Sequence, residues 1–172
     1  MDDSTAANVF RNIKSYSYKN FIRSFQFKLL ADITFTNHRL SKIEKNDQCT
    51  FCEEGLETVH HLFYECSFSH RFWKHFENFW FMLSEKYVEF TSKDVFVGRQ
   101  VGESDQLLNY LFILAKLHIW NCRKRRVPSN LENLKAMLDV KYRTEMDLAS
   151  KNDKVKQFQA KWQFYINVRD TR

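Results

Sequence analysis

Apolar side chains recur every three or four residues along much of this 172-residue chain, which is the spacing of one face of an α-helix. The first such stripe consists of Tyr18, Phe21, Ile22, Phe25 and Leu29. A wider aromatic stripe consists of Phe72, Trp73, Phe76, Phe79, Trp80 and Leu83. Aromatic residues at helical spacing are typical of a protein core, so we expect both stripes to pack inside the molecule.

The central helix of the fold is predicted at residues 107–122, because this segment is hydrophobic on nearly all sides. The helix begins near Ser104 and ends before Pro128, since proline cannot continue it. Cys122 lies far along the chain from the other cysteines, and we expect it to be a buried apolar side chain.

Two further helices are predicted in the C-terminal part of the chain. The pattern Ser-Asn-Leu-Glu at residues 129–132 matches a capping box, in which Ser129 and Glu132 satisfy each other's helix-start amides. The apolar face of that helix contains Leu131, Leu134, Leu138 and Tyr142. The last helix begins at Asn152 or Asp153, and its apolar face contains Val155, Phe158, Trp162 and Tyr165.

Shorter elements and composition complete the fold prediction. Asn37 is a good N-cap for a brief helix with Leu40 and Ile43, and residues 95–98 fit an extended segment or a single turn. Only three glycines and one proline disfavour a turn-rich β architecture. We therefore expect one all-α domain over residues 1–172, an irregular helical bundle with a flexible terminus at residues 1–10.

Three of the four cysteines fall within residues 49–66, in the pattern Cys49-x2-Cys52-x8-His61-x4-Cys66. Thiolate and imidazole ligands at such spacings are typical of structural zinc sites. A tight turn lets both members of the Cys-x2-Cys pair reach one ion, and Thr58 can cap a helix that leads to the later ligands. Five residues advance about 500° around an α-helix, so His61 and Cys66 cannot share one face of a helix unless the helix ends between them. We therefore expect His61 in the last helical turn and Cys66 just past it, in a module of about residues 46–67.

Spacing alone leaves alternatives open at this cluster. His60 and His61 give gaps of five and four residues before Cys66, and both gaps suit a zinc ligand. The cysteines could instead be small buried apolar side chains or a redox pair. No secretory signal opens the sequence, and no strand-rich pattern supports a thioredoxin-like motif, so reduced thiols that bind metal inside the cell are the favoured interpretation.

These residues resemble a known family. Cys-x2-Cys, followed by Glu57-Thr58, His61-Leu62-Phe63, Cys66 and then Phe72-Trp73, is similar to the zinc-binding region near the C-terminal end of non-LTR retrotransposon reverse transcriptases. Looser similarity extends over residues 20–130. The resemblance implies a CCHC zinc knuckle with His61, rather than His60, as its histidine ligand.

The formal net charge of +6 is unevenly distributed. Residues 11–45 contain eight cations and two anions, residues 46–115 five and eleven, and residues 116–172 fourteen and six. Phosphate backbones are the commonest polyanions for such basic segments. The Arg-Lys-Arg-Arg run at residues 123–126 exceeds what a helix dipole needs at its last turn. The predicted nucleic-acid contacts are Lys19, Arg23, Lys28, Arg39, Lys42, Lys45, Arg123, Lys124, Arg125 and Arg126.

The sequence lacks the features of the resembled polymerase's catalytic core. Apart from Asp2-Asp3, no adjacent aspartate pair is present to hold Mg²⁺, and the one proline does not form the Pro-Asp step of the nuclease that some relatives contain. A zinc ion with four protein ligands has no open position for catalysis. We therefore expect a non-catalytic module rather than an enzyme.

Two functions remain as hypotheses. The resemblance implies a module of a reverse transcriptase that binds template RNA or target DNA through phosphates during target-primed reverse transcription, next to a catalytic part of the polymerase, in the nucleus or the cytoplasm. The alternative is a structural or protein-interaction domain, a remnant of an inactive element, in which zinc only holds the helices together. The acidic middle segment favours this second hypothesis. No apolar run approaches the ~20 residues of a membrane helix, so we expect no membrane contact.

Overall fold

The computed structural model describes residues 20–44, 46–99 and 104–170. Within these residues the chain forms helices joined by turns and no β-strand, which confirms the predicted all-α class. The flexible terminus was predicted at residues 1–10, which lie outside the described part. Tyr18, the predicted start of the first stripe, also lies outside it. None of the helices described combines the length and the apolar character that a membrane span requires.

Two helices precede the cysteine cluster. Helix α2, Asn20–Leu30, buries Ile22, Phe25 and Leu29 as predicted, but Phe21 is 63% exposed. Helix α3, Asn37–Glu44, is the predicted short helix, yet Ile43 is 81% exposed. Periodicity identifies an apolar face without fixing its width, so these two residues continue their stripes beyond the part that is buried.

Helix α4, Ser67–Ser84, buries every member of the predicted aromatic stripe. The indole Nε1 of Trp73 donates a 2.7 Å hydrogen bond to the carbonyl of Phe63, which ties α4 to the turn before it. The next helix, α5, spans Ser92–Val97 and starts at a capping box of Thr91 and Asp94. Of the two predicted alternatives, the helical turn is right and the extended segment is wrong for residues 95–97, and the cap at Thr91 starts the helix three residues before the predicted segment.

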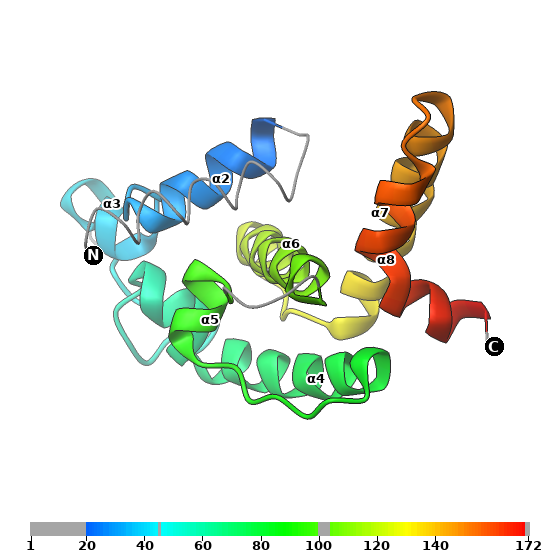
Figure 1. Ribbon diagram of the computed structural model, residues 1–172. Helices are drawn as coiled ribbons and strands as arrows, with labels where there is room; N and C mark the ends of the chain where they lie inside the picture. Colours follow the sequence, from blue (N-terminus) through cyan, green and yellow to red (C-terminus); the bar gives the residue numbers. More distant parts are fainter. Residues whose placement is uncertain (1–19, 45, 100–103, 171–172) are drawn as a thin grey trace.

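Helix α6, Ser104–Arg125, is the predicted central helix. In Figure 1 it lies in the middle of the molecule, with α2 above it and α4 below it. All side chains from residue 107 to residue 119 are buried, which explains why the segment shows almost no polar face. Cys122 is buried as expected, 3.6 Å from Nε2 of His118.

Helices α7, Leu131–Lys151, and α8, Val155–Asp170, form an antiparallel hairpin beside α6 (Figure 1). Asn130, and not Ser129, caps α7, because the Asn130 side chain accepts the backbone amide of Glu132. Asp153, with a φ of 53°, lies in the turn before the last helix, which begins at Val155, slightly later than the predicted Asn152 or Asp153. Its face buries Phe158 and Trp162, whereas Val155 at its start is exposed.

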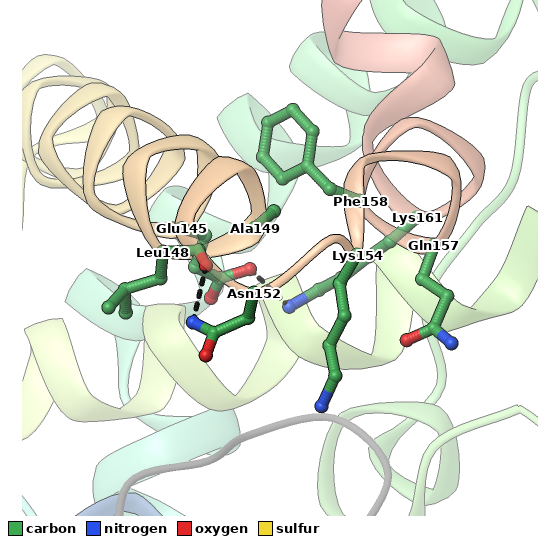
Figure 2. A pocket seen from close by; sticks show the side chains of 8 residues that line it. All are labelled: Glu145, Leu148, Ala149, Asn152, Lys154, Gln157, Phe158 and Lys161. Carbon is green, nitrogen blue, oxygen red and sulfur yellow. Dashed lines mark hydrogen bonds and ion pairs between the residues drawn. The ribbon is translucent and has the colours of Figure 1, made fainter.

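Glu145 joins the hairpin to the core. Its two oxygens accept hydrogen bonds from the Tyr110 hydroxyl at 2.8 Å, Lys161 Nζ at 2.8 Å and Trp162 Nε1 at 3.0 Å. Figure 2 shows Glu145 and Lys161 in the hollow between α7 and α8. Burial lowers the pKa of Lys161, although the neighbouring Glu145 carboxylate opposes that shift.

Candidate metal centre

A tight hairpin positions the first two cysteines. The amide of Cys49 donates to the carbonyl of Gly55 at 2.7 Å, and the amide of Glu57 donates to the carbonyl of Asp47 at 2.8 Å. Within this hairpin, the amide of Glu53 bonds the carbonyl of Cys49, and Glu53 has a φ of 59°. The chain thus reverses just after the Cys-x2-Cys pair, which brings both thiols to the inner side of the turn.

The second half of the site is a wide helical turn. The Thr58 hydroxyl accepts a hydrogen bond from the amide of His61 at 3.0 Å, so Thr58 caps this helical segment as predicted. Residues His61–Glu65 form a π-helical turn, closed by a 2.8 Å bond from the Cys66 amide to the His61 carbonyl. His61 therefore lies in the last helical turn and Cys66 just past it, as expected, although this turn is π-helical and not α-helical.

The π turn explains how His61 and Cys66 reach one point. A hydrogen bond between residues five apart places the first and last residue of the turn near each other, which α-helical spacing does not allow. At Cys66 the backbone leaves the helix, with φ −53° and ψ 132°, before α4 begins at Ser67. Single π turns of this kind are frequent at functional sites.

The side chains of Cys49, Cys52, His61 and Cys66 form one cluster, and their ligand atoms all lie within 4.8 Å of one another. The sulfurs of Cys49 and Cys66 are 3.8 Å apart, and Cys52 Sγ is 3.3 Å from His61 Nε2. Zinc–sulfur bonds of about 2.3 Å in a tetrahedron give sulfur–sulfur edges of about 3.8 Å. The dimensions and the donor types of this cluster therefore fit zinc.

Hydrogen bonding at the site matches ligands that lose protons to a cation. All four cysteines of the chain are free thiols, and Cys49 and Cys66 are buried. Cys49 donates a hydrogen bond to Cys66, and this bond and, to a smaller extent, burial raise the pKa of Cys49. Cys66 accepts the bond, which lowers its pKa. Zinc binds cysteine as thiolate, so each of these thiols would release its proton to solvent when the dication binds.

His60, the alternative ligand, points elsewhere. Its Nε2 lies 2.6 Å from the Ser92 hydroxyl, and its Nδ1 lies 3.1 Å from a Glu65 oxygen. Its ring also stacks on Phe96 with 5.6 Å between centroids. Because both ring nitrogens have other partners, the geometry favours His61, in agreement with the family resemblance.

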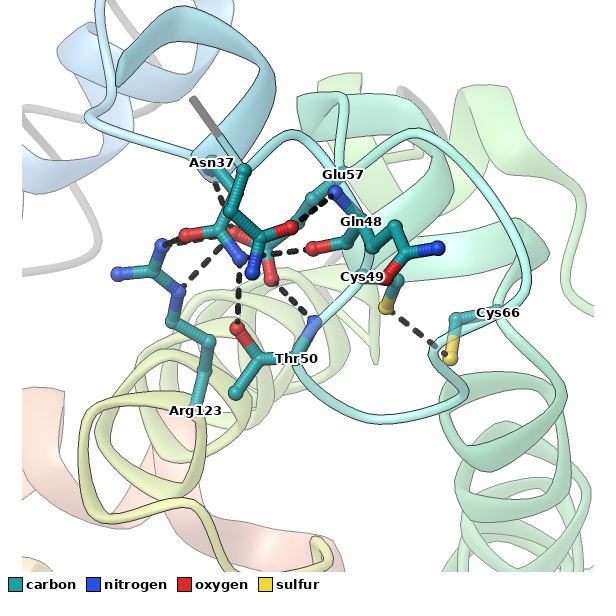
Figure 3. A network of polar contacts seen from close by, with 8 residues as sticks. Asn37, Gln48, Cys49, Thr50, Glu57, Cys66 and Arg123 are labelled. Atoms are coloured by element: carbon teal, nitrogen blue, oxygen red, sulfur yellow. Dashed lines mark hydrogen bonds and ion pairs between the residues drawn. The ribbon is translucent and has the colours of Figure 1, made fainter. Parts of the chain in front are cut away.

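A buried carboxylate connects the metal loop to the rest of the fold (Figure 3). Glu57 is fully buried and accepts the backbone amides of Asn37 at 2.8 Å and Thr50 at 2.7 Å. Its Oε1 also receives Nε and Nη2 of Arg123, at 3.1 and 2.7 Å. Burial alone would raise the pKa of Glu57, but the hydrogen bonds from Arg123 and Thr50 outweigh it, so the pKa lies below the ordinary value.

Sequence reasoning missed this role of Glu57 and assigned different roles to its partners. Asn37 does not cap α3 with its side chain, because Nδ2 donates to the Gln48 carbonyl and Oδ1 accepts Nη2 of Arg123. Arg123, predicted to contact nucleic acid, is half-buried and paired with Glu57. The only signal available was the position of Glu57 between the cysteine pair and His61, which does not distinguish a buried acid from an exposed one.

The remaining predicted cations lie on two parts of the molecule. Lys28 at the end of α2 and Arg39 on α3 are exposed, as are Lys124, Arg125 and Arg126 at the end of α6. Arg23 is half-buried in α2. Lys19, Lys45 and the side chain of Lys42 lie outside the described residues.

Fold and site together define a helical protein with a closed Cys3His cluster able to hold a structural metal ion. Residues 6–73 match the family model described as zinc-binding in reverse transcriptase. This match supports a reverse transcriptase zinc-binding domain over these residues, which is an accessory domain and not the catalytic core, with zinc as its cofactor at the Cys3His cluster. No curated protein matches the chain, and neither does any solved structure.

Proposed function

We propose that this protein is a non-catalytic module of a non-LTR retrotransposon reverse transcriptase that binds template RNA or target DNA during target-primed reverse transcription. Zinc has a structural part in this proposal, because Cys49, Cys52, His61 and Cys66 occupy all four positions of a tetrahedral ion. The cations outside the metal cluster bind the phosphate backbone.

The contact between Asn37 and Arg123 is the observation that supports this proposal best. It joins the start of α3 to the end of α6, at a distance of 2.6 Å between Oδ1 and Nη2. Exposed cations flank both residues, with Arg39 on α3 and residues 124–126 after Arg123. The two basic segments of the sequence therefore meet beside the zinc loop, and neighbouring cations attract a polyanion more strongly than separated ones.

A structural or protein-interaction domain is the second candidate, and the metal loop itself favours it. Glu53 and Glu54, at the tip of the hairpin, are exposed acids, and residues 46–115 have a net charge of −6. A phosphate backbone would avoid this tip. In the first proposal, contacts are therefore confined to the α3 and α6 side of the module.

A pair of charge-matched variants tests the proposal. K124E/R125E/R126E reverses the exposed run at the end of α6, and K151E/K154E/K156E reverses three exposed lysines near the turn between α7 and α8. Both variants change the net charge by the same amount. The first should weaken binding to single-stranded RNA or duplex DNA and flatten its salt dependence, measured by fluorescence anisotropy at low and physiological salt, more than the second.

Two outcomes would contradict the proposal. Equal losses in the two variants would mean that binding depends only on net charge. Wild-type protein that binds neither RNA nor DNA at low salt would favour the structural alternative. Circular dichroism and zinc content establish that both variants are folded.

A further inference from the structure

A groove between α4 and the start of α7 lies outside the metal centre and next to the basic run. Its volume is about 480 Å³, within the usual range for sites that bind small molecules or single nucleotides. The α4 side contributes Phe68, Arg71, Phe72 and His75, and residues 128–132 form the other wall. Pro128 follows Arg125 and Arg126 by only a few residues, so exposed cations lead directly to this groove.

The half-buried ring of Phe68 and the exposed guanidinium of Arg71 together form a cationic, aromatic platform at this site. The guanidinium carbon of Arg71 lies 5.2 Å from the centre of the Phe68 ring, in cation–π geometry. Phe51, in the metal loop, packs against the Phe68 ring with 6.3 Å between the ring centroids. Arg71 is exposed, and planar guanidinium and aromatic groups are the surfaces on which unpaired bases stack.

The polar groups of the groove suit a nucleotide as well. His75 is exposed on the same side as Arg71, and the acid on the opposite wall, Glu132, forms an ion pair with Lys135 at 2.8 Å. Ser129 also lines the groove, and its buried hydroxyl has no hydrogen-bond partner among the described residues. A buried hydroxyl without a partner is costly, so a ligand with polar edges would stabilise this site.

We propose that the groove binds one unpaired nucleotide of a single-stranded nucleic acid, with the base on the platform of Phe68 and Arg71 and its phosphates toward Arg125 and Arg126. This inference rests on the proposed function and adds a preference for unpaired bases to it. A duplex, whose bases are stacked inside, cannot place a base on the platform.

Binding by single strands of about twelve nucleotides, a footprint typical of such surfaces, tests this inference. The probes are single-stranded RNA, single-stranded DNA, duplex DNA of the same length and an abasic strand with phosphates but no bases. Wild-type protein should bind the normal strands more tightly than the abasic strand. Phe68→Ala should weaken binding of the normal strands about tenfold and leave binding of the abasic strand unchanged.

Two further variants separate stacking from charge and from folding. Arg71→Lys keeps the cation but loses the planar group, so it should also weaken binding to the normal strands alone. Phe81→Ala removes an exposed ring from the same helix and should have no effect on binding. Comparison of the RNA and DNA strands identifies which of them supplies the unpaired nucleotide.

The outcomes separate this inference from the broader one. If Phe68→Ala and Arg71→Lys are folded and bind all probes as the wild type does, the groove is not a nucleotide site, whereas the phosphate-binding proposal survives. Equal loss for normal and abasic strands would also overturn the stacking role. If wild-type protein binds no probe, both proposals are wrong.

Discussion

Glu57 and Arg123, 66 residues apart in the sequence, form a buried ion pair in which Nη2 lies 2.7 Å from Oε1. The Glu57 side chain is 0% exposed and that of Arg123 13%. Because Glu57 also accepts the amide of Thr50, one residue after Cys49, the pair connects the metal loop to the end of α6. The position of the basic run relative to the zinc site therefore depends on this contact.

Replacement of one partner should destabilise the fold strongly. Glu57→Gln leaves the Arg123 charge without its anion inside the protein, and we expect a loss of about 3 kcal/mol in the free energy of unfolding, measured in urea. Glu54→Gln, in the same loop but exposed, is the control and should be nearly neutral. In a double-mutant cycle with Arg123→Met, a coupling energy near zero would contradict a role for the pair.

The same pair predicts how stability depends on acid. The pKa of Glu57 is lowered in the folded state, so the unfolded state binds more protons as the pH falls. Its stabilisation is complete above the unfolded-state value of about 4.5 and is lost as the pH falls through the lower folded-state value. Wild-type protein should therefore lose stability below that pH more steeply than Glu57→Gln, and parallel curves would be evidence against this linkage.

Metal analysis of histidine variants tests the ligand set. We expect purified wild-type protein to contain one zinc ion per chain, His61→Ala to lose most of it, and His60→Ala to retain it, because His60 binds Ser92 and Glu65 instead. Chelation should lower the melting temperature of the wild type and have little effect on His61→Ala. Loss of zinc on replacement of His60 alone would reverse the assignment.

Gly55 should be sensitive to a single added methyl group. A Cβ at this position would lie 3.2 Å from Cε1 of His61, tighter than most carbon contacts in proteins. Gly55→Ala should therefore push the imidazole away from the cysteines and weaken zinc binding about tenfold, measured by competition with a chromogenic chelator. Val97→Ala, on α5, is the control for general destabilisation. Unchanged zinc affinity in Gly55→Ala would mean that the ring moves freely.

Hydrophobic periodicity predicted the helices well because it reports burial directly. The stripe on α4 and the all-round apolar segment of α6 are core in the structure, whereas Phe21 and Ile43 continue their patterns onto the surface. Ligand spacing identified the metal cluster, since the four residues are close in the sequence. The π turn at His61–Glu65 could not be predicted from a period of 3.6 residues.

Contacts between distant segments were equally beyond sequence reasoning. The partner of Glu57 lies 66 residues away, and no local pattern indicates that Arg123 faces inward while its three neighbours are exposed. The predicted cap of α7 was wrong by one residue, since Ser129 and Asn130 are both good caps and only the backbone path decides between them. Whether residues 1–172 fold as one domain stays a prediction.

Lys116 should make stability depend on alkaline pH. It is 1% exposed on α6, and its Nζ donates to the carbonyl of Val95 at 2.6 Å, in the last turn of α5. Burial lowers its pKa from 10.5 to about 7. Below about 7 both the folded and the unfolded state are protonated, and above 10.5 both are neutral, so the contribution of this residue is constant outside that interval.

Between these values the folded state has lost the proton that the unfolded chain keeps, so the free energy of unfolding should rise with pH by a few kcal/mol. Lys116→Met removes this rise, whereas Lys93→Met, at an exposed position on α5, should preserve it. Urea denaturation at a series of pH values from about 7 to about 10 measures the difference. If the curves of wild type and Lys116→Met stay parallel over this interval, the buried amine remains charged, and its carbonyl partners at the end of α5 stabilise that charge as well as water does.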